Sequence, residues 1–156
     1  MKPIILLMLI LVCSFSCNSK KEQRVDVITM NNTRPIDELK KLVLLKGDTA
    51  AYNELATAYL NEKYGEEYLI YSLVMANKYK YPRAYHEVYF CLTSAFNHGN
   101  GEIDEDTKAI AIKYLQTGVV LNDPASLMEM GELYLEGKYF PKDTILGNEL
   151  YERGWK

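Results

Sequence analysis

The C-terminal segment from Asp123 to Trp155 constrains the fold of this chain more than any other stretch. Its apolar residues follow helical spacing on both sides of a short break, which predicts two amphipathic helices. Gly131 leaves a flat spot on the first helix, and Gly137 can adopt the left-handed conformation that ends a helix. Asp143 suits the N-cap of the second helix. Because such a pair cannot bury its apolar stripe alone, it requires neighbours of the same kind.

The residues of this segment follow a recognisable order. They read Met130-Gly131-x-x-Tyr134-x-x-Gly137, then Asp143, then Leu150-Tyr151-x-Arg153-Gly154. This order resembles one unit of the Sel-one-like repeat, a branch of the tetratricopeptide superfamily. Two positions depart from the family pattern, since Tyr139 stands where the family usually has a loop Gly and Leu150 where it has Trp. The resemblance implies a fold made of stacked antiparallel helix pairs.

Five further helices are predicted upstream of this pair. Gly, Pro and Asp residues separate them, and their approximate ranges are 35–47, 48–63, 65–80, 82–97 and 104–121. We expect Leu45 and Ile110 on the apolar faces of their helices. Leu55, Val88 and Met130 recur at intervals within the ~20–45 residues of solenoid repeats. The sequence therefore predicts an all-α, right-handed α-solenoid over residues 35–156, built from a half repeat and three full repeats.

The N-terminus has the features of a targeting signal. Residues 1–16 contain one Lys and an apolar run that is too short to cross a bilayer, which needs ~20 residues. Ser14-Phe15-Ser16-Cys17 resembles a bacterial lipobox, which implies cleavage before Cys17 and its modification by acyl chains such as palmitate. The polar stretch 17–34 is then a lipidated tether, and Asn18 after the Cys favours the outer membrane. The alternative is an ordinary signal peptide that happens to contain a Cys.

The sequence carries no familiar catalytic pattern. It has no GxSxG, P-loop, HExxH or paired CxxC. His86 is expected to point away from the apolar stripe of its helix, His98 falls in a predicted loop, and Cys91 is expected to be a small buried hydrophobe. We therefore predict no enzymatic activity, no metal site and no cofactor. The net charge of −3 offers no basic face to a nucleic acid.

The remaining candidate for function is the concave face, which the first helix of each pair should line. The positions expected to contact a protein partner there are Asn53, Thr57, Tyr64, His86, Phe90, Thr93, Glu129, Glu132 and Glu136. Phe90 is either part of a second packing layer or a recognition anchor. The three Glu either steer a cationic partner or only keep their helix soluble. Trp155 either folds back as a lid or leaves an apolar edge.

Two functions fit these features. The first is a lipid-anchored scaffold or adaptor of the cell envelope, which binds another envelope protein and has no catalytic activity. The second is an immunity protein that neutralises a toxin delivered to the periplasm by a neighbouring cell, a class that small lipidated helical-repeat proteins resemble. The expected partner is thus an envelope protein or an incoming toxin, and the membrane is contacted through the lipid anchor.

Overall fold

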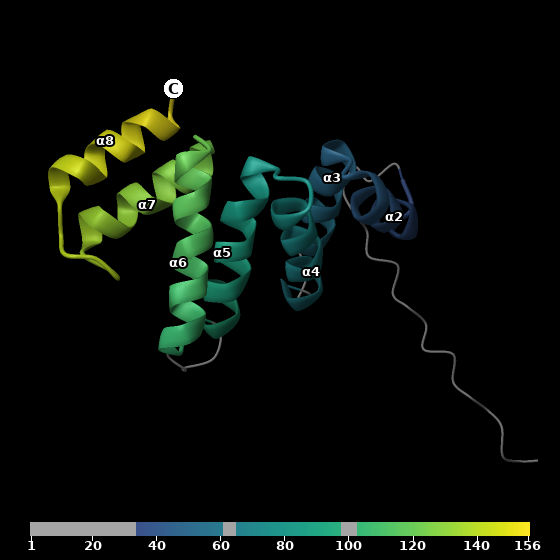
Figure 1. The fold of residues 1–156 in the computed structure, drawn as a ribbon, viewed down its shortest axis with the longest axis horizontal. Helices are drawn as coiled ribbons and strands as arrows, with labels where there is room; N and C mark the ends of the chain where they lie inside the picture. The colour runs from purple at the N-terminus through teal and green to yellow at the C-terminus, as the bar shows by residue number, and fades with distance from the viewer. Residues whose placement is uncertain (1–33, 61–64, 98–102) are drawn as a thin grey trace, which may run out of the picture.

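The computed structural model describes residues 34–60, 65–97 and 103–156, and within them it contains α-helices and no strand. The helices are α2 (Ile36–Lys46), α3 (Thr49–Leu60), α4 (Gly65–Asn77), α5 (Pro82–Asn97), α6 (Glu105–Val120), α7 (Pro124–Glu136) and α8 (Thr144–Gly154). The predicted all-α class is confirmed. Figure 1 shows the helices following one another in chain order, from α2 at one end of the molecule to α8 at the other. The predicted signal peptide, Cys17, the tether up to residue 33 and Tyr64 lie outside the described residues.

Most helix ends form at the residues that the sequence indicates. The side chains of Asp104, Asp123 and Asp143 accept hydrogen bonds from backbone N–H groups in the first turns of α6, α7 and α8. Gly47 (φ 64°) and Gly137 (φ 75°) end α2 and α7 in the left-handed conformation. Local capping chemistry therefore fixes where these helices begin and end.

Helix α5 belongs to two hydrophobic cores. Ala84 and Val88 pack with buried residues of α2, α3 and α4. Tyr89 packs with buried residues of α6, α7 and α8. Adjacent residues of a helix point in directions about 100° apart, so one helix can serve both cores. α5 consequently joins the two halves of the molecule.

The N-terminal core is built around a stack of tyrosine rings. Tyr52 and Tyr59 of α3 interleave with Tyr68 and Tyr71 of α4. The ring centroids are 5.4 Å apart for Tyr52 and Tyr68, 6.0 Å for Tyr59 and Tyr68, and 6.1 Å for Tyr59 and Tyr71. We call these four residues the tyrosine stack. Because whole rings lie between the two helices, α4 packs more extensively against α5 than against α3.

The C-terminal pair is built the opposite way, through glycines that let α7 and α8 touch. A Cβ on Gly131 would lie 2.8 Å from the carbonyl oxygen of Gly147 and 2.9 Å from the amide nitrogen of Tyr151. A Cβ on Gly154 would lie 2.7 Å from the carbonyl oxygen of Pro124. These separations are shorter than carbon atoms tolerate, so the backbones meet only because side chains are missing. The close approach expected at Gly131 is confirmed.

Four expectations about individual residues can be compared with the structure. Leu45 and Ile110 were expected on apolar faces, but they are 73% and 52% exposed, because they lie on the sides of α2 and α6 that no other helix covers. Pro35 is the residue before α2 and not part of its first turn. Trp155 is 70% exposed, so it does not fold back as a lid. Cys91 is buried as expected.

Candidate functional site

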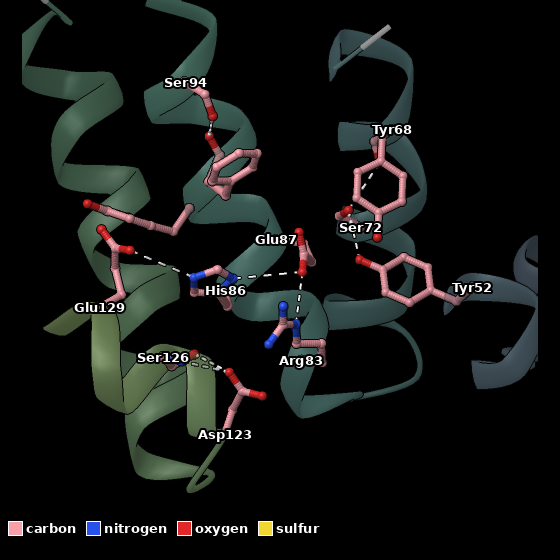
Figure 2. A network of polar contacts seen from close by, with 12 residues as sticks. Tyr52, Tyr68, Ser72, Arg83, His86, Glu87, Ser94, Asp123, Ser126 and Glu129 are labelled. Carbon is pink, nitrogen blue, oxygen red and sulfur yellow. Dashed lines mark hydrogen bonds and ion pairs between the residues drawn. The ribbon is translucent and has the colours of Figure 1, made fainter. Parts of the chain in front are cut away.

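Three of the predicted binding residues come together where α5 meets α7. Nε2 of His86 lies 3.9 Å from Oε2 of Glu129, which reaches across from α7 (Figure 2). The imidazole also stacks on the ring of Phe90, with centroids 6.5 Å apart and planes 17° apart. The His86 side chain is only 13% exposed, so the expectation that it points away from the packed face is wrong. Phe90 is 41% exposed and is therefore a ring that a partner could reach.

A buried carboxylate extends this cluster along α5. Glu87 is 5% exposed, and its Oε1 accepts a hydrogen bond of 2.8 Å from Nε of Arg83. Nδ1 of His86 lies 3.8 Å from the same oxygen, a separation typical of an ion pair and too long for a hydrogen bond. Nδ1 is buried and has no hydrogen-bond partner within the described part of the chain. Figure 2 shows Glu87 between Arg83 and His86.

The charges of this cluster stabilise one another. Burial lowers the pKa of His86, but the carboxylates of Glu129 and Glu87 outweigh it and raise the pKa to about 8. The same imidazole lowers the pKa of Glu129. Burial alone would raise the pKa of Glu87, yet His86 and Arg83 bring it below its ordinary value. Near neutral pH the cluster therefore holds two cations and two carboxylates, and its charge is balanced.

The other predicted residues are distributed along α3, α5 and α7. Thr57 and Thr93 each donate a hydrogen bond to a backbone carbonyl four residues earlier in their own helices. Asn53 is exposed on α3, and Glu132 and Glu136 are exposed one turn apart on α7. The two carboxylates leave this side of α7 acidic and open to solvent.

A cleft of about 410 Å³ lies beside the cluster. Its lining includes Tyr52, Tyr68, Tyr81, Arg83, Glu87 and Asp123, which come from α3, α4, the turn before α5, α5 itself and the N-cap of α7. We call it the tyrosine cleft. Asn53 is the one predicted binding residue in its lining.

The sequence held partial signals for the cleft residues that we missed. Arg83 and Glu87 are four residues apart, a spacing that places both on one face of a helix. Tyr52 and Ala56, which both line the cleft, are also four apart and share a face. Nothing local indicated that Asp123, which is 96 % buried as an N-cap, would reach a cleft formed by α3 and α5. That contact depends on how the two halves pack.

Cys91 is the free cysteine among the described residues, and its environment does not activate it. Burial raises the pKa of the Cys91 thiol to about 12, so the sulfur stays protonated at neutral pH and is a poor nucleophile. No group of three or more His, Cys, Asp or Glu side chains within residues 34–60, 65–97 and 103–156 is placed to hold a metal ion. None of the described helices is long and apolar enough to cross a membrane.

Comparison with known proteins adds no family. No protein-family model, curated protein or solved structure is significantly similar to this chain. The function must therefore be argued from the residues and their geometry.

Proposed function

We propose that this chain is a lipid-anchored protein-binding module of the bacterial cell envelope, built as a right-handed α-solenoid of Sel-like helix pairs. The observation that carries the proposal is the cluster of His86, Phe90 and Glu129. It joins α5 to α7 and places a partly exposed aromatic ring beside the acidic side of α7. Aromatic residues, Phe included, are enriched in protein interfaces, so an exposed ring in this position is a candidate anchor.

Two features support the solenoid and its repeat family. The first is the contact of Gly131 with Gly147 and of Gly154 with Pro124, at glycine positions that the repeat pattern includes in part. The second is Tyr139, which stands where the family usually has a loop Gly. Its φ of 66° is the left-handed conformation that favours Gly. A left-handed backbone at this position is what a loop Gly would adopt readily, which supports the proposed resemblance.

The anchor is tested by metabolic labelling with an alkyne-tagged palmitate. We expect the tag on the wild-type chain and on Cys91→Ser, because Cys91 is buried, but not on Cys17→Ser. Label retained by Cys17→Ser would overturn the lipid anchor. Fractionation of the inner and outer membranes in the same cells tests the predicted outer-membrane location.

Binding is tested by affinity purification from solubilised envelopes. We expect one partner to be recovered with the wild-type chain and lost with Phe90→Ala/Glu132→Lys. Ile110→Ala/Glu105→Lys is the matched control, because it also replaces a large apolar residue by Ala and a Glu by Lys, at exposed positions of α6. A partner that both double variants retain would place binding elsewhere on the molecule, and loss in both would show a general effect of charge.

The acidic side of α7 favours the immunity protein as a second candidate. Glu132 and Glu136 are exposed there, and carboxylates on an open surface speed the encounter with a basic toxin. This candidate predicts that the chain protects a cell exposed to a toxin-delivering neighbour, and that Glu132→Lys/Glu136→Lys weakens the protection. Equal survival with and without the chain would count against it.

A further inference from the structure

We propose that the tyrosine cleft receives a basic side chain, Lys or Arg, of the partner protein. The inference rests on the proposed function, because it names the chemistry by which the partner is recognised. The cleft lies on the same side of α5 as Phe90. Arg83 in its lining and Phe90 are seven residues apart and therefore share one helix face.

The walls of the cleft suit the stem and head of a basic side chain. Tyr52 stacks with Tyr68, and Tyr81 stands almost perpendicular to Tyr52, with centroids 5.8 Å apart and an interplanar angle of 88°. Tyr52 and Tyr68 are almost fully buried behind this corner, so Tyr81, which is partly exposed, offers the apolar surface that methylene groups can contact first. Aromatic rings also attract an ammonium or guanidinium group. The volume of about 410 Å³ is sufficient for one long side chain.

One of the two buried carboxylates, Asp123, provides the charge, because Glu87 is already paired with Arg83 and His86. Asp123 is 4% exposed, and its Oδ2 accepts both hydrogen bonds from Ser126, from the backbone N–H and from the hydroxyl, each 2.8 Å long. Figure 2 shows the other oxygen of Asp123 directed away from Ser126. Within the described residues, hydrogen bonds to Glu87 reach only its Oε1. Each carboxylate therefore has an oxygen that an N–H donor could use.

The hydroxyl of Tyr68 is a second and independent indication of a ligand. The residue is 2% exposed, and its hydroxyl is buried with no hydrogen-bond partner among the described residues. A buried hydroxyl without a partner is costly, so most native structures pair it. Tyr68 lines the cleft, and its oxygen could accept a hydrogen bond from an ammonium or guanidinium group bound there.

The sign of the charge follows from the lining. Arg83 is bonded to Glu87, and its side chain is 45% exposed, whereas Glu87 and Asp123 are both buried. Arg83 and His86 offset the charge of Glu87, so the carboxylate of the lining without a paired cation among the described residues is Asp123. An anion in the cleft would be repelled by Asp123, whereas a cation beside it would be attracted, and low exposure strengthens that attraction. The occupant is thus a basic group.

The test uses the full chain in detergent, with ¹³C-labelled tyrosine rings. It is titrated with butylguanidinium and butylammonium, and with butanoate as the anionic match, at constant ionic strength. We expect saturable shifts of the Tyr52, Tyr68 and Tyr81 ring signals with both cations and none with butanoate. The signals are assigned from the three Tyr→Phe variants. Saturable binding of butanoate, or no saturable shift with either cation, would overturn the inference.

A charge variant that keeps the fold sharpens the test. Asp123→Asn retains a good N-cap for α7 but removes the charge, so we expect the cations to bind about tenfold more weakly. Asp106→Asn is the control, since Asp106 is exposed and outside the lining, and we expect it to bind as the wild type does. Equal affinity in Asp123→Asn would contradict the inference. If the cations fail to bind while the envelope partner is still recovered, only this inference fails; if the partner is also absent, the proposed function fails.

Discussion

The two halves of the molecule solve the packing of a helix pair in opposite ways. Between α3 and α4, rings of the tyrosine stack lie 5.4–6.1 Å from one another and occupy the space between the helices. Between α7 and α8, missing side chains let the backbones meet at Gly131 and Gly147. The tyrosine cleft lies where the tyrosine half meets the N-cap of α7, with Tyr52, Tyr68 and Asp123 in its lining. The two packing modes should therefore respond differently to the loss or the addition of a side chain.

The largest expected effect on stability comes from removing one ring of the tyrosine stack. Tyr52→Ala removes a ring that is 0% exposed, and large-to-small changes of aromatic core residues cost about 3–5 kcal/mol. Urea unfolding followed by far-UV circular dichroism measures the loss. The control is Phe90→Ala, which removes a partly exposed ring of the same size class and should cost much less. Equal losses in both variants would show that the tyrosine stack is not a special support.

Adding a side chain where there is none tests the close contact of α7 and α8. Gly131→Ala places a Cβ 2.8 Å from the carbonyl oxygen of Gly147, and backbone atoms cannot move aside as a side chain would. We expect a loss of about 1–3 kcal/mol through overpacking, and a larger loss for Gly131→Leu. Glu132→Ala, at the exposed neighbouring position of α7, should change stability by less than about 0.5 kcal/mol. An unchanged melting temperature in Gly131→Leu would refute the close contact of α7 and α8.

The stability contributed by His86, where α5 meets α7, should depend on pH. The pKa of His86 is raised from its ordinary value of 6.5 to about 8 in the folded chain, so folding favours the imidazolium. The stabilisation is fully present below about pH 6.5 and is lost as the pH rises through 8, and it amounts to about 2 kcal/mol. Arg83, Glu87 and Glu129 surround the ring, and both carboxylates have lowered pKa values, so their own titration falls in the acid range.

Unfolding in urea at a series of pH values between 6 and 9 measures this effect. His86→Gln keeps a polar side chain but removes the titration, and we expect the pH dependence in that window to disappear. The Glu129→Gln variant should reduce it, since one of the two carboxylates is then neutral. A pH profile that is the same in the wild type and in His86→Gln would contradict the proposed coupling of α5 and α7.

The smallest expected effect is a difference in stability between two Tyr→Phe variants of the same stack. The hydroxyl of Tyr52 lies 2.9 Å from Oγ of Ser72, so Tyr52→Phe should cost about 1 kcal/mol. The hydroxyl of Tyr68 has no partner among the described residues, so Tyr68→Phe should be neutral or slightly stabilising. The two variants form a matched pair, because each removes one oxygen from a buried ring. A larger loss in Tyr68→Phe would mean that its hydroxyl is bonded.

Local signals predicted the helices well and the site only in part. The N-caps at Asp123 and Asp143 and the stop at Gly137 depend on residues within one turn, and the structure confirms them. The exposure of Leu45 and Ile110 depends on which sides of α2 and α6 receive neighbours, and spacing alone does not determine it.

The cleft could not be predicted because its parts come from distant segments. Tyr52, Tyr81 and Asp123 meet only after α3, α5 and α7 have packed together. The contact of His86 with Glu129 depends on the same packing. His86 was expected to point outward, but its side chain connects α5 with α7. Phe90 could be singled out because an aromatic residue among polar neighbours on one helix face is visible in the sequence, which left open whether the ring forms a second packing layer or a recognition anchor; it is 41% exposed.

The most direct test of the account is photocrosslinking in living cells, with benzoylphenylalanine at position 90 or, as the control, at position 145. Ile145 is 83% exposed on α8, away from the proposed binding surface. Cells are grown alone and in mixed culture with toxin-delivering neighbours, so that an envelope partner and an incoming toxin are both captured. The account predicts one crosslinked protein from position 90, absent when Glu132→Lys is added, and none from position 145. No product from position 90, or the same products from both positions, would contradict it.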